Sequence, residues 1–122
     1  MTAKILLVDD SGLARRGVRH ILESAGYQVV EAEDGLSALE RYFLEKPHLV
    51  LLDLVMKGMT GLDVLKKLQE MDAAARVVVV SADIQDSSRA LAEAGGACGF
   101  VTKPVDRASI LKAVAGALEV PR

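Results

Sequence analysis

Short runs of aliphatic and β-branched residues alternate with longer amphipathic segments along this chain of 122 residues. Three of the runs are almost pure Leu, Ile and Val, which is typical of strands buried on both faces of a parallel sheet. Strict alternation of strands and helices predicts a single α/β domain, in which right-handed crossovers place helices on both faces of the sheet. The predicted strands are Ile5–Val8, Tyr27–Glu31, Leu49–Leu52, Val77–Val80 and Gly99–Thr102.

Each amphipathic segment carries its apolar residues at the spacing of one helical face. In the first segment Ala14, Val18 and Ile21 share one side, and charged residues occupy the other. Gly26 is predicted to cap the C-terminal end of this helix. The apolar stripes of the predicted helices run through Ala14–Ala25, Leu36–Phe43, Leu62–Leu68 and Ile110–Leu118, and a weaker, Ala-rich helix is predicted at about Ile84–Ala94.

Composition and charge narrow the class of protein. The net charge is -2 and the pI is about 5.7, whereas a nucleic-acid-binding domain usually has a basic face and a high pI. The small basic group of Arg15, Arg16 and Arg19 is expected on the solvated face of the first helix. The only cysteine, Cys98, excludes an internal disulfide and is expected to be a buried or half-buried thiol. No apolar run resembles a signal peptide or membrane span. We therefore expect a cytoplasmic domain that does not insert into a membrane and does not bind nucleic acid directly.

Polar residues follow several of the predicted strands at the point where each strand ends. Asp9 and Asp10 follow the first strand, Asp53 the third, Ser81 the fourth and Lys103 the fifth. Ligands of open α/β sheets bind at this carboxyl edge. Converging carboxylates repel one another unless a cation lies among them, and Mg²⁺ prefers such oxygen ligands. Zinc is disfavoured, because no His or Cys follows these strands.

Carboxylates, a metal, an ammonium group and a hydroxyl together indicate a phosphoryl-transfer site. A carboxylate can itself be the nucleophile and form an acyl phosphate, and Asp53 is the best candidate because it stands alone at a central strand end. Each element also has a simpler interpretation. Asp10 or Ser11 could cap the first helix, and Ser81 could cap the fourth. Asp53 could be a loop acid before a turn, and Lys103 could belong to an ordinary strand exit. The convergence of all of them on one edge favours the functional interpretation.

The segments ILLVDDS, LVLLDLVMKGMTGLDVL, VVVVSAD and GFVTKPV resemble the receiver domain of two-component response regulators, especially the single-domain chemotaxis type. The resemblance covers essentially the whole chain. It implies a flavodoxin-like (βα)5 fold, a doubly wound parallel five-stranded sheet with strand order 2-1-3-4-5. It also implies that residues 1–122 form one receiver domain with no output domain.

The resemblance assigns roles at the acidic edge. Asp53 would accept a phosphoryl group from a phosphohistidine on a sensor histidine kinase or a phosphotransfer protein. Asp10 and Asp53 would bind Mg²⁺ directly, Asp9 would act through a water molecule, and the backbone carbonyl of Val55 would be a further ligand.

The resemblance also implies a switch. Lys103, the Ser81 hydroxyl and the Ala82 amide would bind the phosphoryl oxygens, and a cis bond before Pro104 would set the direction of Lys103. Phosphorylation would draw Ser81 toward the site, and Phe100 would move into the vacated space. A downstream protein target or a phosphatase would read the face formed by the fourth helix, last strand and fifth helix, with the protein a monomer or a weak homodimer on phosphorylation.

The loop after Asp53 departs from the family pattern. Lys57 stands where the family usually has Pro, and we expect it to be a solvated lysine in a looser loop. Gly61 is the expected turn glycine. Val55 and Asp83 hold positions that tune the lifetime of the phosphoryl group in this family, and the sequence does not assign either a direction.

Three alternatives remain at the level of the sequence. A haloacid dehalogenase-type phosphatase would show its acids two residues apart, whereas Asp9 and Asp10 are adjacent. A flavin- or nucleotide-binding domain would need a Gly-rich phosphate loop, whereas the first loop is acidic. A receiver that serves only as a docking module usually lacks one of the acidic, hydroxyl or lysine positions, all of which are present. We therefore expect a phosphoacceptor that catalyses only its own phosphorylation and dephosphorylation and is no enzyme in the usual sense.

Overall fold

The five strands form one parallel sheet in the order β2-β1-β3-β4-β5, as predicted. The structure is a computed structural model and describes residues 2–82 and 86–120. Two strands are one residue longer than predicted, because Asp53 and Ser81 belong to them. Backbone hydrogen bonds continue past Asp53, from Leu54 N–H to Val80 O, and at Ser81, whose carbonyl accepts from Lys103 N–H. The strands are β1 Lys4–Val8, β2 Gln28–Ala32, β3 Leu49–Asp53, β4 Val77–Ser81 and β5 Gly99–Thr102.

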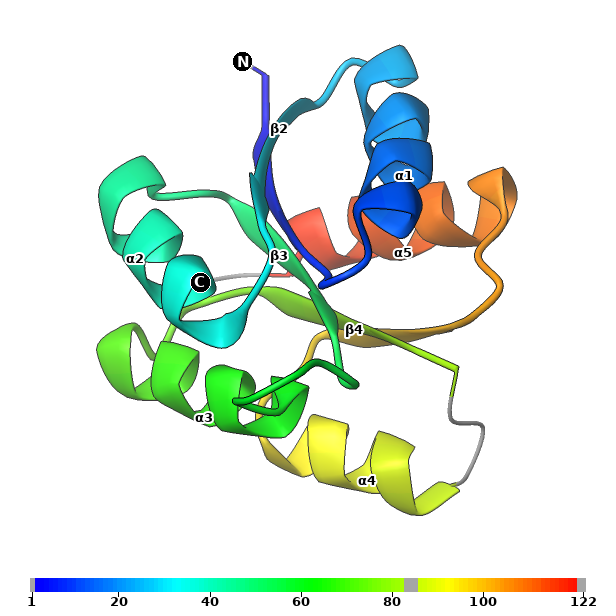
Figure 1. The fold of residues 1–122 in the computed structure, drawn as a ribbon. Coiled ribbons are helices and arrows are strands. Elements are labelled where there is room, and N and C mark those ends of the chain that lie inside the picture. Colours follow the sequence, from blue (N-terminus) through cyan, green and yellow to red (C-terminus); the bar gives the residue numbers. More distant parts are fainter. Residues whose placement is uncertain (1, 83–85, 121–122) are drawn as a thin grey trace.

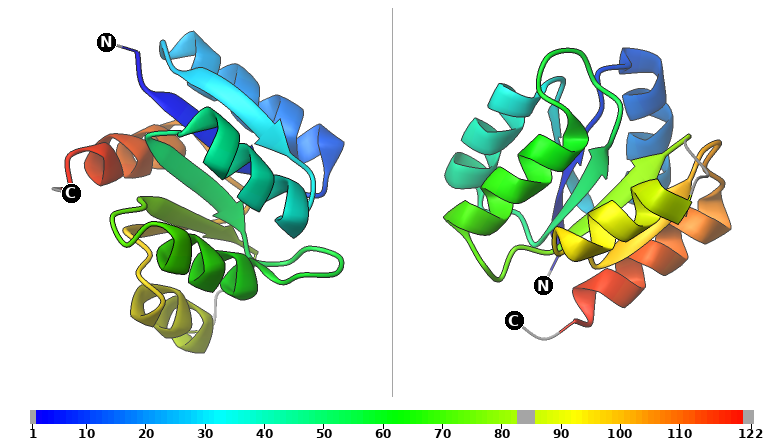
Figure 2. Two further views of the ribbon diagram at one scale, coloured as in Figure 1. Left: turned by 90° about the vertical axis from the view of Figure 1, so that its left-hand side faces the viewer. Right: turned by 90° about the horizontal axis from the view of Figure 1, so that it is seen from below.

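Helices cover both faces of the sheet, with α1 and α5 on one side and α2, α3 and α4 on the other (Figure 1 and Figure 2). They are α1 Gly12–Ser24, α2 Gly35–Glu45, α3 Gly61–Met71, α4 Asp86–Ala94 and α5 Arg107–Leu118. Within the described part of the chain, no helix is long and apolar enough to cross a membrane.

Successive residues of the strands alternate between two apolar cores. Leu6, Val50 and Val79 pack toward α2, α3 and α4, whereas Leu49 and Val78 pack toward α1 and α5. Every residue of β3 and β4 is buried, as expected for central strands of a sheet covered on both sides. The carboxyl ends of these two strands are therefore rigidly held, and they carry Asp53 and Ser81.

Local capping fixes where the helices begin and end. Ser11 is the N-cap of α1 and its side chain accepts a hydrogen bond from Ala14 N–H, which leaves the Asp10 carboxylate outside the cap. Gly26 follows α1 with a φ of 94°, the left-handed conformation that glycine adopts without strain, as predicted. Cys98 is exposed, so the expectation of a buried or half-buried thiol was wrong: the residue directly precedes β5, the edge strand, which has a neighbouring strand on one side only.

Candidate functional site

The carboxylates of Asp9, Asp10 and Asp53 converge at the carboxyl edge of the sheet. An oxygen of each lies within 4.8 Å of an oxygen of the others. Asp9 follows β1 and Asp53 ends β3, and each of these residues is only 6% exposed, whereas Asp10 is exposed. The cluster thus has two buried members and one that faces solvent.

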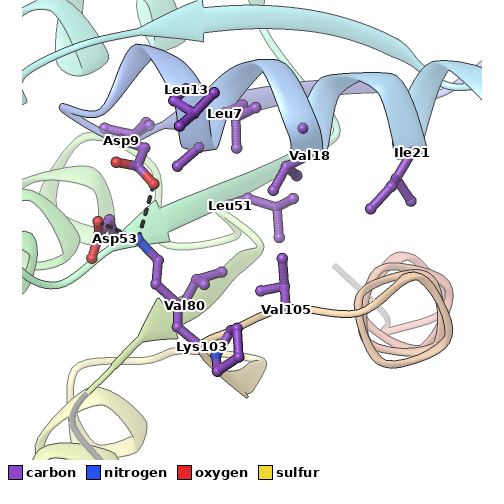
Figure 3. Close-up of a pocket in the computed structure, with 14 residues that line it drawn as sticks. Leu7, Asp9, Leu13, Val18, Ile21, Leu51, Asp53, Val80, Lys103 and Val105 are labelled. Atoms are coloured by element: carbon purple, nitrogen blue, oxygen red, sulfur yellow. Dashed lines mark hydrogen bonds and ion pairs between the residues drawn. The ribbon is translucent and has the colours of Figure 1, made fainter.

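Lys103 joins the two buried carboxylates. Its Nζ lies 3.1 Å from Asp9 Oδ2 and 2.9 Å from Asp53 Oδ2 (Figure 3). The residue comes directly after β5, its backbone N–H donates to Ser81 O at 2.8 Å, and the bond from Lys103 to Pro104 is cis. The ammonium group therefore reaches the acids from the far side of β4.

Burial and pairing act in opposite directions on these charges. Burial raises the pKa of the Asp53 carboxyl, and hydrogen bonds from Lys103 and from Val55 N–H offset this only in part. Burial would lower the pKa of Lys103, but the hydrogen bonds and charges of Asp53 and Asp9 outweigh it and raise that pKa. Among the described residues, the Lys103 ammonium pairs with two of the three clustered carboxylates, which leaves an excess of negative charge that a divalent cation would neutralise. Carboxylate oxygens are hard ligands, so the donor set fits Mg²⁺.

The loop between β3 and α3 closes over the acids. Val55 N–H donates to Asp53 Oδ1 at 3.1 Å, and Lys57 N–H donates to Asp10 Oδ2 at 3.2 Å. Gly61 opens α3 against the backbone of β3: a Cβ atom there would lie 2.4 Å from Asp53 O. The Lys57 side chain is exposed, as predicted.

Ser81 and Phe100 lie on neighbouring strands and on the same side of the sheet. Val79 is the register partner of Phe100, and both contact the core beneath α2, α3 and α4. Ser81 comes two residues after Val79, so its side chain projects from the same face, and it is fully buried. Phe100 is half-buried and the Arg89 guanidinium lies 5.8 Å from its ring centroid. Ala82 is exposed, and Asp83 lies outside the described residues.

An apolar cavity of about 340 Å³ extends from the acids along α1. Figure 3 shows Asp9, Asp53 and Lys103 at its polar end, with Val18 and Ile21 of α1 and Val105 lining the rest. These walls keep the surroundings of the two buried acids apolar, which accords with the raised pKa of Asp53.

Two charged residues near the acids were not recognised from the sequence. Arg15, expected on a solvated face, is half-buried: its Nε lies 2.9 Å from Glu31 Oε1, and its Nη1 donates to Asp9 O at 2.5 Å. Arg19 also pairs with Glu31. The signal was present, because Arg15 and Arg19 lie one helical turn apart and Glu31 is the penultimate residue of the neighbouring edge strand β2, but charge pattern alone does not tell a solvated face from a paired one.

A doubly wound parallel sheet that gathers acids, a lysine and a buried serine at its carboxyl edge defines a class of protein, the phosphoacceptor domains. Residues 5–115 match the family model of the response regulator receiver domain. The chain belongs to this family and is a phosphoacceptor domain of two-component signalling. Membership decides against the phosphatase and flavin-binding alternatives.

Relatives of known role agree with this assignment. The chain is 38% identical over 115 residues to the chemotaxis protein CheY of Bacillus subtilis, covering 93% of this chain and 96% of that protein. It is 35% identical over 118 residues to CheY of Halobacterium salinarum, covering 97% and 98%. A 47% identical match to a protein-glutamate methylesterase/protein-glutamine glutaminase of Myxococcus xanthus covers 83% of this chain but 30% of that protein.

A solved structure has nearly the same fold. It is the complex of CheX and CheY with BeF3 and Mg²⁺ from Borrelia burgdorferi, which superposes with a TM-score of 0.93 at 30% identity and covers 97% of this chain and 90% of that chain.

Proposed function

We propose that Asp53 accepts a phosphoryl group from a phosphohistidine of a sensor histidine kinase or phosphotransfer protein, in a Mg²⁺-dependent reaction. The observation that supports it most directly is the setting of the Asp53 carboxylate: it is buried, bonded to Lys103 at 2.9 Å, and clustered with the acids of β1. One carboxylate oxygen attacks the phosphorus atom, the bond from phosphorus to the histidine nitrogen breaks, and an acyl phosphate results. The domain thus catalyses its own phosphorylation and dephosphorylation and turns over no separate substrate.

The acids and the adjoining loop would hold the metal. Asp10 and Asp53 would be direct ligands, Asp9 would act through water, and the carbonyl of Val55 would complete the protein's contribution. When bound, Mg²⁺ neutralises charge that develops on the phosphoryl oxygens. Lys103 contributes a second positive charge to the same oxygens, and its pairing with Asp53 already directs Nζ to the reacting carboxylate.

Ser81 and Ala82 would bind the remaining phosphoryl oxygens, and Phe100 would follow Ser81. The placement of both side chains on one face of β4 and β5 supports this coupling. The phosphoryl group carries nearly two negative charges and three strong acceptors, and it would alter the face formed by α4, β5 and α5, where a downstream target or phosphatase would bind. The Borrelia CheY was solved with CheX, which supports signalling through protein contacts. We propose that this occurs in the cytoplasm, with the domain a monomer or weak homodimer.

Incubation with Mg²⁺ and a small acyl phosphate, followed by intact mass spectrometry, tests the assignment. We expect one added phosphoryl group in the wild type and none in Asp53→Asn. Asp63→Asn is the matched control, because Asp63 is an exposed acid on α3, and it should be labelled like the wild type. A stable adduct on Asp53→Asn would overturn the assignment, and a wild type that takes no label would favour a receiver that serves only as a docking module.

A further inference from the structure

Arg15 links the acidic loop to the edge of the sheet. Two different nitrogens of its guanidinium are used: Nη1 donates to the backbone carbonyl of Asp9 at 2.5 Å, and Nε donates to Glu31 Oε1 at 2.9 Å. The side chain is only 17% exposed. A planar guanidinium held at two points has little freedom to turn, so its position relative to Asp9 O is fixed.

The carbonyl that Arg15 binds belongs to the peptide between Asp9 and Asp10. Because a peptide unit is planar, holding Asp9 O fixes the orientation of the bond from which Asp10 begins. Asp10 needs such support, since it is exposed and lies beside two other carboxylates that repel it. The amide of Lys57, on a loop, donates to its Oδ2 at 3.2 Å. The Asp9 carboxylate has separate support from Lys103 and from Ser11 N–H.

Arg15 is itself held from the other side. Glu31, in β2, accepts from Arg15 with one oxygen and from Arg19 with the other, the latter at 2.5 Å. Hydrogen bonds from the two arginines hold the pKa of Glu31 below its usual range, with Arg19 the larger cause, so Glu31 stays charged near neutral pH. The chain of contacts therefore runs from helix α1 through strand β2 back to the loop that carries the acids.

We propose that Arg15, oriented by Glu31, is a positioning residue for the metal site. It holds the Asp9–Asp10 peptide so that the Asp10 carboxylate loses little conformational entropy when it binds the metal. This rests on the proposed Mg²⁺ site. Groups that hydrogen-bond around metal ligands typically contribute about 10- to 100-fold to affinity, and we expect the low end of that range because Arg15 acts through the backbone.

Loss of the Arg15 charge and loss of its positioning contact predict opposite changes in Mg²⁺ affinity, which makes the test decisive. Arg15→Gln removes a positive charge near the site, so electrostatics alone would tighten Mg²⁺ binding, whereas loss of positioning would weaken it. Arg16→Gln makes the same charge change at an exposed position of the same helix and is the matched control. Arg15→Lys keeps the charge but replaces the two-point fork with a single ammonium group.

The experiment is calorimetric titration of the unphosphorylated proteins with Mg²⁺, combined with the rate of labelling by acyl phosphate at saturating Mg²⁺. We expect Arg15→Gln to weaken Mg²⁺ binding about tenfold and Arg15→Lys to weaken it in the same direction. Arg16→Gln should match the wild type, and the labelling rate of all variants at saturating Mg²⁺ should stay near that of the wild type.

Unchanged or tighter Mg²⁺ binding by both Arg15 variants would overturn the inference, as would a labelling rate at saturating Mg²⁺ that falls as far as the affinity. If Arg15→Gln fails to fold, Arg15→Lys decides alone. A wild type that binds no Mg²⁺ would instead refute the proposed function, so the two failures are distinguishable.

Discussion

Replacing Gly61 by Ala should destabilise the domain, although Ala is the better helix former. Gly61 is the first residue of α3 and lies against the end of β3. A Cβ atom there would lie 2.4 Å from Asp53 O and 2.5 Å from Leu54 Cα. Both neighbours are backbone atoms, so no side chain can rotate away to make room.

The magnitude follows from the shift that is required. Ordinary contact begins at 3.4 Å, so the backbone of β3 and the start of α3 must separate by about 1 Å. Overpacking of this kind costs about 1–3 kcal/mol, and we place the cost near 2–3 kcal/mol because β3 is buried and central. The lower entropy of the unfolded Ala chain returns about 1 kcal/mol. The net loss should therefore be about 1–2 kcal/mol, which lowers the melting temperature by roughly 3–10 °C in a domain of this size.

Urea unfolding followed by circular dichroism measures this difference, with the slope of the free energy against urea checked for constancy. Gly17→Ala is the matched control, because Gly17 lies inside α1 and a Cβ there meets nothing within 4 Å. That variant should gain about 0.5–1 kcal/mol from the ordinary preference of helices for Ala over Gly. The same chemical change is thus expected to have opposite signs at the two sites.

The reasoning fails if Gly61→Ala is as stable as the wild type while Gly17→Ala is stabilised. That result would mean that the start of α3 can move away from β3 at little cost in free energy. Asp53 ends β3, so if α3 packs rigidly against that strand, the forced shift should also displace Asp53. We therefore expect slower acyl phosphate labelling of Gly61→Ala and normal labelling of Gly17→Ala.

Three further predictions concern charge, metal and hydrogen bonding. An acid whose pKa is raised on folding binds more protons in the folded state, so stability falls as pH rises through that pKa. Because burial raises the pKa of Asp53, Asp53→Asn in EDTA should lose less unfolding free energy than the wild type as pH rises from about 4, and an equal loss would show that the pKa of Asp53 is not raised on folding. Mg²⁺ at ten times its dissociation constant should stabilise the wild type by about 1.4 kcal/mol in urea unfolding, whereas no stabilisation would argue against the site. Tyr42→Phe removes a hydroxyl that donates to Asp72 Oδ2 at 2.7 Å and should cost about 1 kcal/mol in the same assay, with Tyr27→Phe, in the other core, as the control that should change less.

The fold was predictable because its central strands are almost wholly apolar. Runs such as Val77–Val80 are typical of strands covered on both faces, and their alternation with helical segments indicates a sheet with helices on both sides. The errors lie at the ends. Asp53 and Ser81 extend β3 and β4 by one residue each, because backbone pairing with a neighbour continues whatever the side chain is. Pairing of that kind is a tertiary contact, and hydrophobic pattern carries no information on it.

The site was predictable as a collection of residues but not as a set of contacts. Position at strand ends was enough to bring Asp9, Asp53 and Lys103 to one edge. Sequence could not decide whether Asp10 or Ser11 caps α1, because both are good caps; the geometry gives that role to Ser11. Nor could it reveal Arg15, whose partners come from a strand and a loop that are brought together only by the fold.

The charges of the site explain why such a domain can act as a switch. Asp9, Asp10 and Asp53 with Lys103 leave two uncompensated negative charges, which one Mg²⁺ would balance. Phosphorylation converts the single charge of Asp53 into nearly two and adds acceptor oxygens beyond the reach of the original carboxylate. In the proposed site the ends of β1 and β3 supply the acids that would hold the metal, so the new acceptors would be met by donors at the ends of β4 and β5. Ser81 ends β4 and Lys103 directly follows β5, and movement of these residues is what the face containing Phe100 would report.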